Sequence, residues 1–559
     1  MKKILPISVI GILIFNSLVV SGSSLYAQSA QQSPSLNEYD MVVIAPDIFS
    51  DKIQPLINHK NSVGILTFLK TIEDIYGEYP GRDNAEQIKY FIKDAIENYN
   101  IQFVLLIGGI DFIPARYTHI YFHDDFGYPT PSEWIFPSDF YYADIYDENK
   151  NFSSWDSNNN DVFAEYAWDG NYDLLDFTSD VYLGRLPCNN DEEVRNCVQK
   201  IMNYEIINAW AQNWFNTIVY IGGDSLPGDP GKIDEGEYVQ QQVINIMQGF
   251  IPFRIWASNG DLNSPLDINE AINEGAGFVF FNGHGNYNKW ATHPHESRQW
   301  IPKGYYTLND IENLENKEKL PIIISDACYH CQYDDHSNCF AWSFVNHPNG
   351  GAIAFIGGSN TDLGFPGTAI VEKGIERLCL EISYHYMNGC LFLGKLVGDA
   401  IISYNDGNMN EVDIITILQN HLFGDPSLMI SGSSHPPFAP NPPVGVSSGK
   451  IKIEYSYSVE TEDPDGDDIY YLFDWGDDRT SGWTGPYKSN ETCNLSHTWE
   501  KQGSYDIKVR AKDEHGVQSE WSDPLVVSMP KNKALNLIFF QFLGRLMGRF
   551  PLLKFLLDF

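Results

Sequence analysis

A histidine and a cysteine each follow an apolar stretch of the sequence, and both are residue types that carry out covalent catalysis. His284 lies between two glycines shortly after residues 277–281, and Cys328 comes shortly after residues 321–325. Short stretches rich in β-branched and aromatic residues and bounded by Gly or Pro are typical of buried parallel strands. A thiol needs a base to become a nucleophilic thiolate, and a neighbouring imidazole is the usual one. The pair therefore predicts an enzyme with a cysteine nucleophile.

The segment that joins these two strands determines whether the two side chains can meet. Residues 307–320 carry Leu308, Ile311 and Leu314 at helical spacing, which predicts a strand–helix–strand unit. Both strands of such a unit point the same way, so we expect the histidine and the cysteine at the same carboxyl edge of the sheet. Open α/β sheets hold their ligands at that edge.

Strands and helices alternate over nearly four hundred residues around this unit. The predicted strands are residues 41–48, 63–69, 101–109, 180–186, 217–222, 277–281, 321–325 and 351–357. The predicted helices are residues 51–60, 84–99, 192–205, 237–249, 266–274 and 368–386. This alternation predicts an α/β fold with helices on both faces of a mostly parallel sheet. Residues 121–178 are rich in Asp, Asn and Tyr, so we interpret them as a long excursion and hypothesise that it binds calcium.

The composition changes after residue 431. Residues 432–450 are dominated by Ser, Gly and Pro, which is typical of a linker. Strand-like alternation then returns over residues 451–529 and predicts a small all-β sandwich. The last segment, residues 530–559, is apolar and basic, but Arg545 and Pro551 interrupt it, so it is too short to span a bilayer.

The start of the chain and its charge bear on where the protein acts. Residues 1–27 have the basic, apolar and small-residue regions of a signal peptide, and residues 28–37 form a polar leader. We therefore predict a secreted protein, extracellular or associated with the cell envelope; an uncleaved membrane anchor is the alternative. The net charge of −38 argues against a nucleic-acid partner, which would need clustered Lys and Arg.

The cysteine also belongs to a second pattern. Cys328, Cys331, His336 and Cys339 are metal-ligand types close to zinc-knuckle spacing. A structural zinc in place of a nucleophile is therefore an alternative, although Cys328 belongs to the predicted strand rather than to a free loop. Pairing of Cys331 with Cys339 as a disulfide, or two free thiols, also remains open.

Several motifs, in order along the chain, resemble one known family. They are Gly283-His284-Gly285, Ser325-Asp326-Ala327-Cys328, and residues 104–109, 113–115, 138–143, 180–187 and 422–428. Together they resemble the gingipain family of cysteine peptidases, within the caspase-like clan, over roughly residues 38–431. The resemblance implies a three-layer α/β/α catalytic region with two subdomains, residues 38–205 and 206–431, and thiol endopeptidase activity on protein or peptide substrates.

The resemblance also implies a role for each site residue. Cys328 would attack the scissile carbonyl, and His284 would transfer protons to the leaving amine. The backbone N–H groups of Cys328 and Gly285 would receive the oxyanion. Asp224 is the nearest match to the acidic residue that orients the histidine, and a solvated loop aspartate is the alternative. No cofactor is required for this chemistry.

In gingipains that cut after basic residues, a carboxylate in the S1 pocket lies on the helix that follows the strand ending here near Gly223. Asp234, Glu235 and Glu237 stand at the start of that helix in this sequence, so we predict substrate binding by these residues and preference for Arg or Lys at P1. Acidic residues in a first helical turn also interact favourably with the helix dipole, which is the alternative explanation.

The C-terminal sandwich resembles the PKD domain in residues 471–477, 497–499 and 503–505. Its carboxylates Asp463, Asp465 and Asp467 lie on a Gly-containing turn and predict a structural calcium site, with a plain acidic turn as the alternative.

Two other functions compete with a secreted peptidase. One is an inactive cell-surface adhesion protein of the same fold, and the other is a processing enzyme or transpeptidase that acts on envelope proteins. For the basic and apolar tail, residues 530–559, we predict contact with a membrane surface or the cell envelope. Folding back onto the sandwich or contact in a dimer is the alternative.

Overall fold

The computed structural model describes residues 39–122, 132–405, 407, 409–431, 437–463, 467–477, 479–513, 519, 521–530 and 545. The predicted signal peptide and leader lie outside the described residues, as does the predicted tail apart from Arg545. No helix in the described part of the chain has both the length and the apolar character needed to cross a bilayer.

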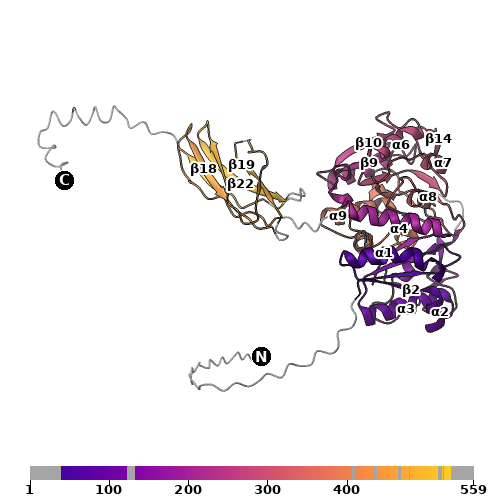
Figure 1. Ribbon diagram of the computed structural model, residues 1–559. Helices are drawn as coiled ribbons and strands as arrows, with labels where there is room; N and C mark the ends of the chain where they lie inside the picture. Colours follow the sequence, from indigo (N-terminus) through magenta and orange to yellow (C-terminus); the bar gives the residue numbers. More distant parts are fainter. Residues whose placement is uncertain are drawn as a thin grey trace, which may run out of the picture. The chain divides into compact units, whose positions relative to one another are not determined.

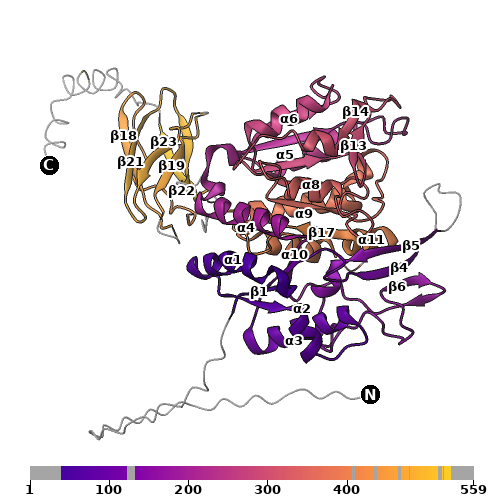
Figure 2. The same ribbon diagram turned by 45° about the vertical axis from the view of Figure 1, so that its right-hand side comes forward.

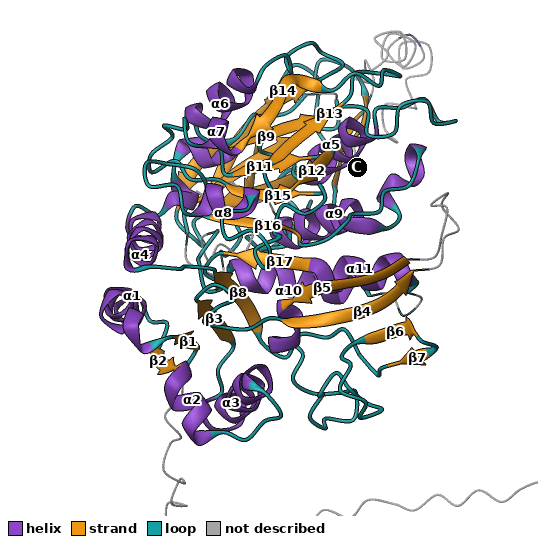
Figure 3. Cartoon of the chain, turned by 90° about the vertical axis from the view of Figure 1, so that its right-hand side faces the viewer, coloured by secondary structure: helices purple, strands orange, loops and turns teal. Residues whose placement is uncertain are grey.

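One ten-stranded sheet forms the centre of the α/β region (Figures 1 and 3). Its strands lie in the order β10 (Ile251–Trp256), β9 (Thr217–Gly222), β11 (Phe278–Phe281), β15 (Ile322–Ser325), β16 (Ala354–Gly358), β17 (Asn420–Phe423), β8 (Tyr182–Leu186), β3 (Phe103–Ile107), β1 (Met41–Ala45) and β2 (Thr67–Thr71). Neighbouring strands from β10 to β16 are parallel, as are those from β17 to β2. The two halves meet antiparallel at β16 and β17.

Helices cover both faces of this sheet. They are α1 (Ser50–Ser62), α2 (Ile72–Glu78), α3 (Asn84–Tyr99), α4 (Asp191–Ile206), α5 (Glu235–Ile246), α6 (Pro265–Glu274), α7 (Leu308–Ile311), α8 (Phe340–Val345), α9 (Gly374–Met387), α10 (Leu393–Tyr404) and α11 (Glu411–Gln419). Figure 3 shows α4, α6, α7 and α8 on one face and α5, α9 and α10 on the other. The predicted three-layer α/β architecture is therefore confirmed.

Local sequence signals explain where the helices begin and end. The Asp83 side chain accepts a hydrogen bond from the Glu86 N–H at the start of α3, and Asn100 takes a left-handed conformation (φ 60°) at its end. Asn190 caps α4 in the same way, by accepting from two backbone N–H groups. Short 3₁₀ turns complete the set: η1 (Asp47–Phe49), η2 (Asp139–Tyr142), η3 (Ala209–Ala211), η4 (Asn213–Asn216) and η5 (Gly367–Val371).

The connection between β11 and β15 differs from the predicted single helix over residues 307–320. A three-stranded antiparallel sheet, β12 (His284–Asn286), β13 (Lys289–Thr292) and β14 (Ile301–Thr307), occupies its first part. The helical part is only α7. Beyond it, the Asn316 side chain donates to the backbone oxygens of Lys319 and Gly351, and Lys317 has a positive φ of 53°. Side-chain bonds of this kind compete with the helical backbone pattern, so the residues around Asn316 do not continue the helix.

Residues 121–178, predicted to be a long excursion, contain strands of a separate small sheet. It consists of β4 (Arg116–Phe122), β5 (Ser132–Ser138), β6 (Glu165–Trp168) and β7 (Asn171–Tyr172), and Figure 2 shows β4, β5 and β6 side by side.

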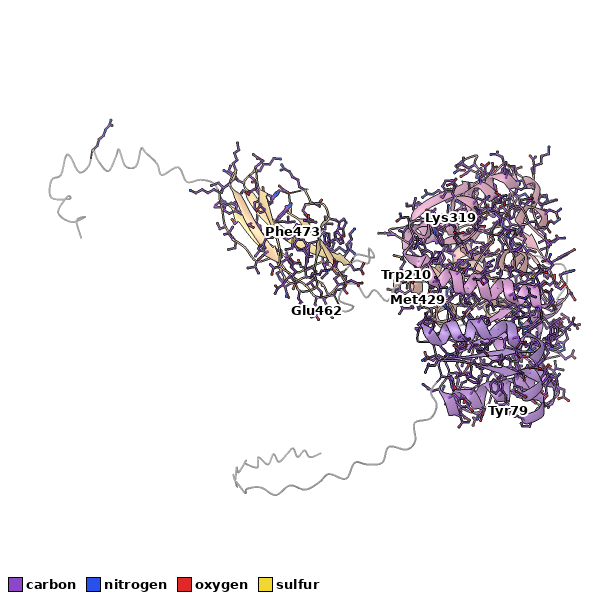
Figure 4. The ribbon with its side chains drawn as sticks, in the orientation of Figure 1. Tyr79, Trp210, Lys319, Met429, Glu462 and Phe473 are labelled. Carbon is purple, nitrogen blue, oxygen red and sulfur yellow. The ribbon has the colours of Figure 1, made fainter. Side chains whose placement is uncertain are left out.

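The C-terminal region has its own hydrophobic core between two small sheets. One pairs β18 (Glu454–Val459) with β21 (Cys493–Thr498); the other holds β20 (Thr484–Tyr487), β19 (Ile469–Asp474), β22 (Gly503–Asp513) and β23 (Leu525–Met529). Phe473, labelled in Figure 4, is fully buried in this core with Trp475 and Trp499. Residues of the predicted linker join the sandwich, because the Val444 N–H donates to the Ser458 carbonyl at 2.8 Å.

Candidate active site

Three adjacent parallel strands bring the predicted catalytic residues to one edge of the sheet. β11 pairs with β9 on one side and with β15 on the other, and Phe281 lies opposite Ser325. His284 and Cys328 each follow these paired residues by three positions. Both line a cavity of about 890 Å³, together with the loop after β9 and the loop after β16. The expectation that the two residues share one sheet edge is borne out by this register.

The imidazole of His284 is held by a backbone carbonyl. Its Nε2 lies 2.6 Å from the carbonyl oxygen of Ser225, in the loop after β9. A carbonyl oxygen only accepts hydrogen bonds, so Nε2 carries the proton and Nδ1 is left as the basic nitrogen. Burial lowers the pKa of His284, the bond to Ser225 opposes this shift, and His293 lowers the pKa further. The ring is therefore neutral at neutral pH and can accept a proton.

Two aromatic side chains, Trp300 and His293, pack against the imidazole of His284. The Trp300 ring lies edge-on to His284 with 5.3 Å between ring centroids, and His293 packs on Trp300 at 4.0 Å. Trp300 remains 42% exposed, so its ring forms part of the cavity wall beside the histidine.

The thiol of Cys328 lies against the loop after β16. Its Sγ accepts a hydrogen bond from the Asp362 N–H at 3.3 Å. Burial raises the pKa of Cys328 to about 12, and the negative charge of Asp362 raises it as well. The next residue, Tyr329, has a positive φ of 60° and is fixed by a bond from its N–H to the Asn360 carbonyl at 2.9 Å. The resting pair is thus a neutral thiol and a neutral imidazole.

Three carboxyl groups line the cavity: Asp326 and Glu376, which are buried, and Asp362, which is half-buried. Asp326 accepts from the Gly283 N–H at 2.9 Å and from the Asn282 side chain. Among the described residues, Oδ2 of Asp362 and Oε2 of Glu376 have no hydrogen-bond partner. Burial raises the pKa of all three groups, that of Asp362 to about 7. The cavity therefore holds acceptor oxygens that a cationic or donor group could satisfy.

Asp224, predicted to orient the histidine, is hydrogen-bonded to the surrounding loops rather than to the ring, and its charge raises the pKa of His284 against the larger effect of burial. Its carboxylate accepts from the Leu226 N–H at 3.0 Å and from the Glu296 N–H at 2.7 Å. Ser225, whose carbonyl accepts the hydrogen bond from His284, lies in the chain between Asp224 and Leu226. The hydrogen-bonded connection from Asp224 to His284 therefore runs through the backbone.

The predicted substrate-binding carboxylates lie at the start of α5, and none of them lines the cavity. Asp234 bonds to Nδ1 of His295 at 2.9 Å, and Glu235 accepts from the Leu226 and Gly367 N–H groups. Glu237 accepts from Ser258, and burial raises its pKa to about 6. Their bonds hold loops around the cavity in place.

The sequence contained a signal for the carboxyl groups that do line the cavity. The predicted strand over residues 351–357 neighbours the cysteine strand, and Asp362 follows it at the same carboxyl edge. No such strand-end signal marks Glu376, because it reaches the cavity from α9. Gly364 makes room for it: a Cβ there would lie 2.9 Å from Oε1 of Glu376.

Cys328, Cys331, His336 and Cys339, the alternative zinc ligands, are not among the groups of described residues that could hold a metal ion. Among the described residues, the groups that could hold a metal are Asp224, Asp234 and His295, and Asp463, Asp467 and Asp513. Cys331 and Cys339 are buried free thiols, and the His336 ring stacks on Tyr287 at 3.5 Å. All eight cysteines are free.

Two of the three predicted calcium ligands in the sandwich lie together. The carboxylate oxygens of Asp463 and Asp467 are within 4.8 Å of each other and of Asp513, which ends β22. Asp463 and Asp513 are buried. Asp465 lies outside the described residues.

Comparisons with known proteins find similar proteins for both regions of the chain. The model of peptidase family C25 matches residues 35–431, and the PKD domain model matches residues 427–524. Gingipain R2 of Porphyromonas gingivalis is 22% identical over 448 residues, which are 76% of this chain and 51% of that protein. Lys-gingipain of the same organism is 24% identical over 277 residues, 45% of this chain and 15% of that protein. The chain thus spans about half the length of the first of these relatives.

A solved structure shows the same fold. The crystal structure of the Arg-specific cysteine proteinase gingipain R aligns with a TM-score of 0.50 and 18% identity. The alignment covers 89% of this chain and 99% of that one.

Proposed function

The chain belongs to peptidase family C25, and on this basis we propose that it is a cysteine endopeptidase in which Cys328 is the nucleophile and His284 the proton carrier. The observation that carries the proposal is the shared cavity of the two side chains at the carboxyl ends of two paired strands. Asp224 positions the histidine through the Ser225 backbone, and no cofactor enters the chemistry.

The reaction starts from the neutral pair. As Sγ of Cys328 bonds to the scissile carbonyl carbon, its proton passes to Nδ1 of His284, and the carbonyl electrons move to oxygen. The resulting oxyanion is received by the N–H groups of Gly285 and Cys328. His284 then protonates the leaving amine as the C–N bond breaks, and water hydrolyses the thioester in a second round. A raised thiol pKa suits this order, because the proton leaves sulfur only when substrate is present.

We further propose preference for Arg or Lys at P1. One similar structure is that of an Arg-specific cysteine proteinase, and one relative bears the name Lys-gingipain. In this chain the support comes from the buried oxygens of Asp362 and Glu376 in the cavity wall, rather than from the α5 carboxylates. A guanidinium or ammonium group would supply donors to these oxygens and favour their charged form.

Secretion, protein substrates and envelope association complete the proposal. The predicted signal peptide supports export, and the acidic composition agrees with a soluble extracellular region. In the sandwich, we propose that Asp463, Asp467 and Asp513 hold a structural calcium ion, because their carboxylate oxygens lie within 4.8 Å of one another and calcium prefers oxygen ligands of this kind.

The test is cleavage of peptides that vary only at P1 by the purified full chain, with and without iodoacetamide. We expect cleavage after Arg or Lys that alkylation of Cys328 abolishes. Activity that survives alkylation would refute the thiol mechanism, and peptides joined rather than hydrolysed would favour the transpeptidase. A thiol that is alkylated without any peptide cleavage would indicate the inactive adhesion protein.

A further inference from the structure

A second histidine lies behind the catalytic cysteine. His330 follows Cys328 by two residues, is fully buried, and does not line the cavity. Its Nδ1 lies 2.8 Å from Oγ of Ser325, the last residue of β15. Its Nε2 lies 3.3 Å from the carbonyl oxygen of Lys289, the first residue of β13. One ring therefore joins the turn that carries Cys328 to the hairpin that carries Gly285.

The His330 ring donates one hydrogen bond and accepts the other. The Lys289 carbonyl can only accept, so Nε2 of His330 carries the proton and Nδ1 accepts from the Ser325 hydroxyl. The Ser325 oxygen in turn accepts from the Ala327 N–H at 3.3 Å. The Phe340 ring stacks on the imidazole with centroids 4.0 Å apart. Burial lowers the pKa of His330 to about 3, so the ring stays neutral and keeps this tautomer.

The same ring lies against the backbone of Gly285. A Cβ at that position would lie 2.3 Å from Nε2 of His330 and 2.9 Å from Cβ of Ala327. Only glycine lets the hairpin approach the cysteine turn this closely, since a Cβ would overlap both. The distance between these two backbone segments is thus set by contact with the His330 ring and by its two hydrogen bonds.

These two segments carry the N–H groups assigned above to the oxyanion. We infer that His330 is a positioning residue that fixes the spacing of the Gly285 and Cys328 N–H donors, an inference that rests on the proposed peptidase function. Donors must lie close to the position that the oxyanion, not the ground-state carbonyl, will occupy. A shift of either segment would therefore weaken transition-state binding more than substrate binding.

The test separates oxyanion binding from thiol reactivity. In His330→Asn, the bond to the Lys289 carbonyl is lost. We expect kcat to fall by about 100-fold, the scale of a misplacement of about 1 Å, with KM nearly unchanged. Affinity for a peptide aldehyde, whose adduct with Sγ carries the oxyanion, should fall in parallel. Alkylation of Cys328 by iodoacetamide displaces iodide without forming an oxyanion, so its rate should stay unchanged. His330→Gln, whose amide can reach the Lys289 carbonyl, should restore part of kcat.

Matched variants control for stability. His347 is another buried histidine, with Nε2 3.3 Å from the Glu312 carbonyl, and it lies outside the cavity. His347→Asn should lower Tm without the selective loss of kcat. Ser325→Ala breaks the other end of the link and serves if His330→Asn does not fold; it should show the same split between kcat and alkylation.

Each outcome has a clear meaning. Unchanged kcat in folded His330 or Ser325 variants would overturn the inference, and so would equal losses of kcat and alkylation rate, which indicate a general collapse of the site. If the wild-type chain showed no alkylation-sensitive peptidase activity, the proposed function would fail and this inference with it.

Discussion

The sulfur of Cys328 accepts a hydrogen bond from the backbone N–H of Asp362 at 3.3 Å, and the side chain of Asp362 lines the same cavity as the sulfur. Asp362, in the loop after β16, thus contacts the Cys328 sulfur through its backbone N–H and places its carboxyl group in the wall of the cavity. Its burial raises the pKa of Asp362 to about 7, and its charge raises the pKa of Cys328. In the proposed peptidase, Asp362 would therefore influence both the reactivity of the thiol and the P1 preference.

Asp362→Asn should weaken recognition of cationic P1 side chains. A hydrogen bond to a charged group contributes about 1.5–3 kcal/mol, so kcat/KM for Arg and Lys peptides should fall by about 10- to 100-fold. Peptides with an apolar P1 residue should be affected much less. Asp261→Asn is the control, because Asp261 is exposed and outside the cavity. Equal losses on both classes of peptide would contradict the assignment.

The pH dependence should differ between the two classes of peptide. Below a pH of about 7 the Asp362 carboxyl is protonated and neutral, and above it the group is ionised. We therefore expect kcat/KM for Arg or Lys peptides to rise as the pH increases through about 7, with no such step for apolar P1 peptides or in Asp362→Asn. The His284 limb lies lower, because burial lowers the pKa of that ring. A step at the same pH for every peptide would count against this explanation.

Cys328→Ala and His284→Ala should each remove peptidase activity while the protein stays folded. Loss of the proton carrier costs about 10²- to 10⁴-fold in rate, and loss of the nucleophile removes the covalent route altogether. Peptide cleavage and circular dichroism measured on the same samples test both parts. Full activity of Cys328→Ala would refute the thiol mechanism.

Calcium should stabilise the sandwich through Asp463, Asp467 and Asp513. An ion present at about 100 times its Kd adds about 2.7 kcal/mol, which raises the Tm of a domain of this size by roughly 10–20 °C. Calorimetry of the full chain with calcium or a chelator measures this shift. Asp513→Asn should abolish it, whereas Asp523→Asn, at an exposed carboxylate, should retain it. An identical Tm in calcium and in chelator would exclude the site.

The tail over residues 531–559 remains a prediction, since only Arg545 of it is among the described residues. Basic and apolar residues together favour anionic membrane surfaces. Deletion of this segment should release the protein from the envelope fraction and leave peptide cleavage unchanged. Retention of the truncated protein in that fraction would disprove the anchoring role.

The parts of the site that follow directly from strand ends were predictable from sequence. The apolar runs before His284 and Cys328 specify two buried strands, and strand pairing then brings both residues together. The predicted helix over residues 307–320 is longer than α7, because the spacing of Leu308, Ile311 and Leu314 does not reveal the side-chain bonds of Asn316 beyond the end of α7.

Other contacts depend on packing between segments that are distant in sequence. The hydrogen bond from His330 to the Lys289 carbonyl joins residues 41 positions apart in the sequence. No local sequence pattern predicts it. Glu376 reaches the cavity only because Gly364 and Gly374 leave space for its carboxyl group. The acidic start of α5 resembled a specificity site in sequence, yet its side chains bond to neighbouring loops.

The reversal of strand direction between β16 and β17 places the carboxyl ends of the two halves of the sheet at opposite edges. Because β17, β8, β3, β1 and β2 run the opposite way, their carboxyl ends face away from the cavity, and every cavity-lining residue comes from positions 225–412. The first half of the catalytic region, although built from the same kind of strands and helices, therefore serves as scaffold. We expect sequence changes in the loops at its carboxyl edge to leave bond cleavage unaffected.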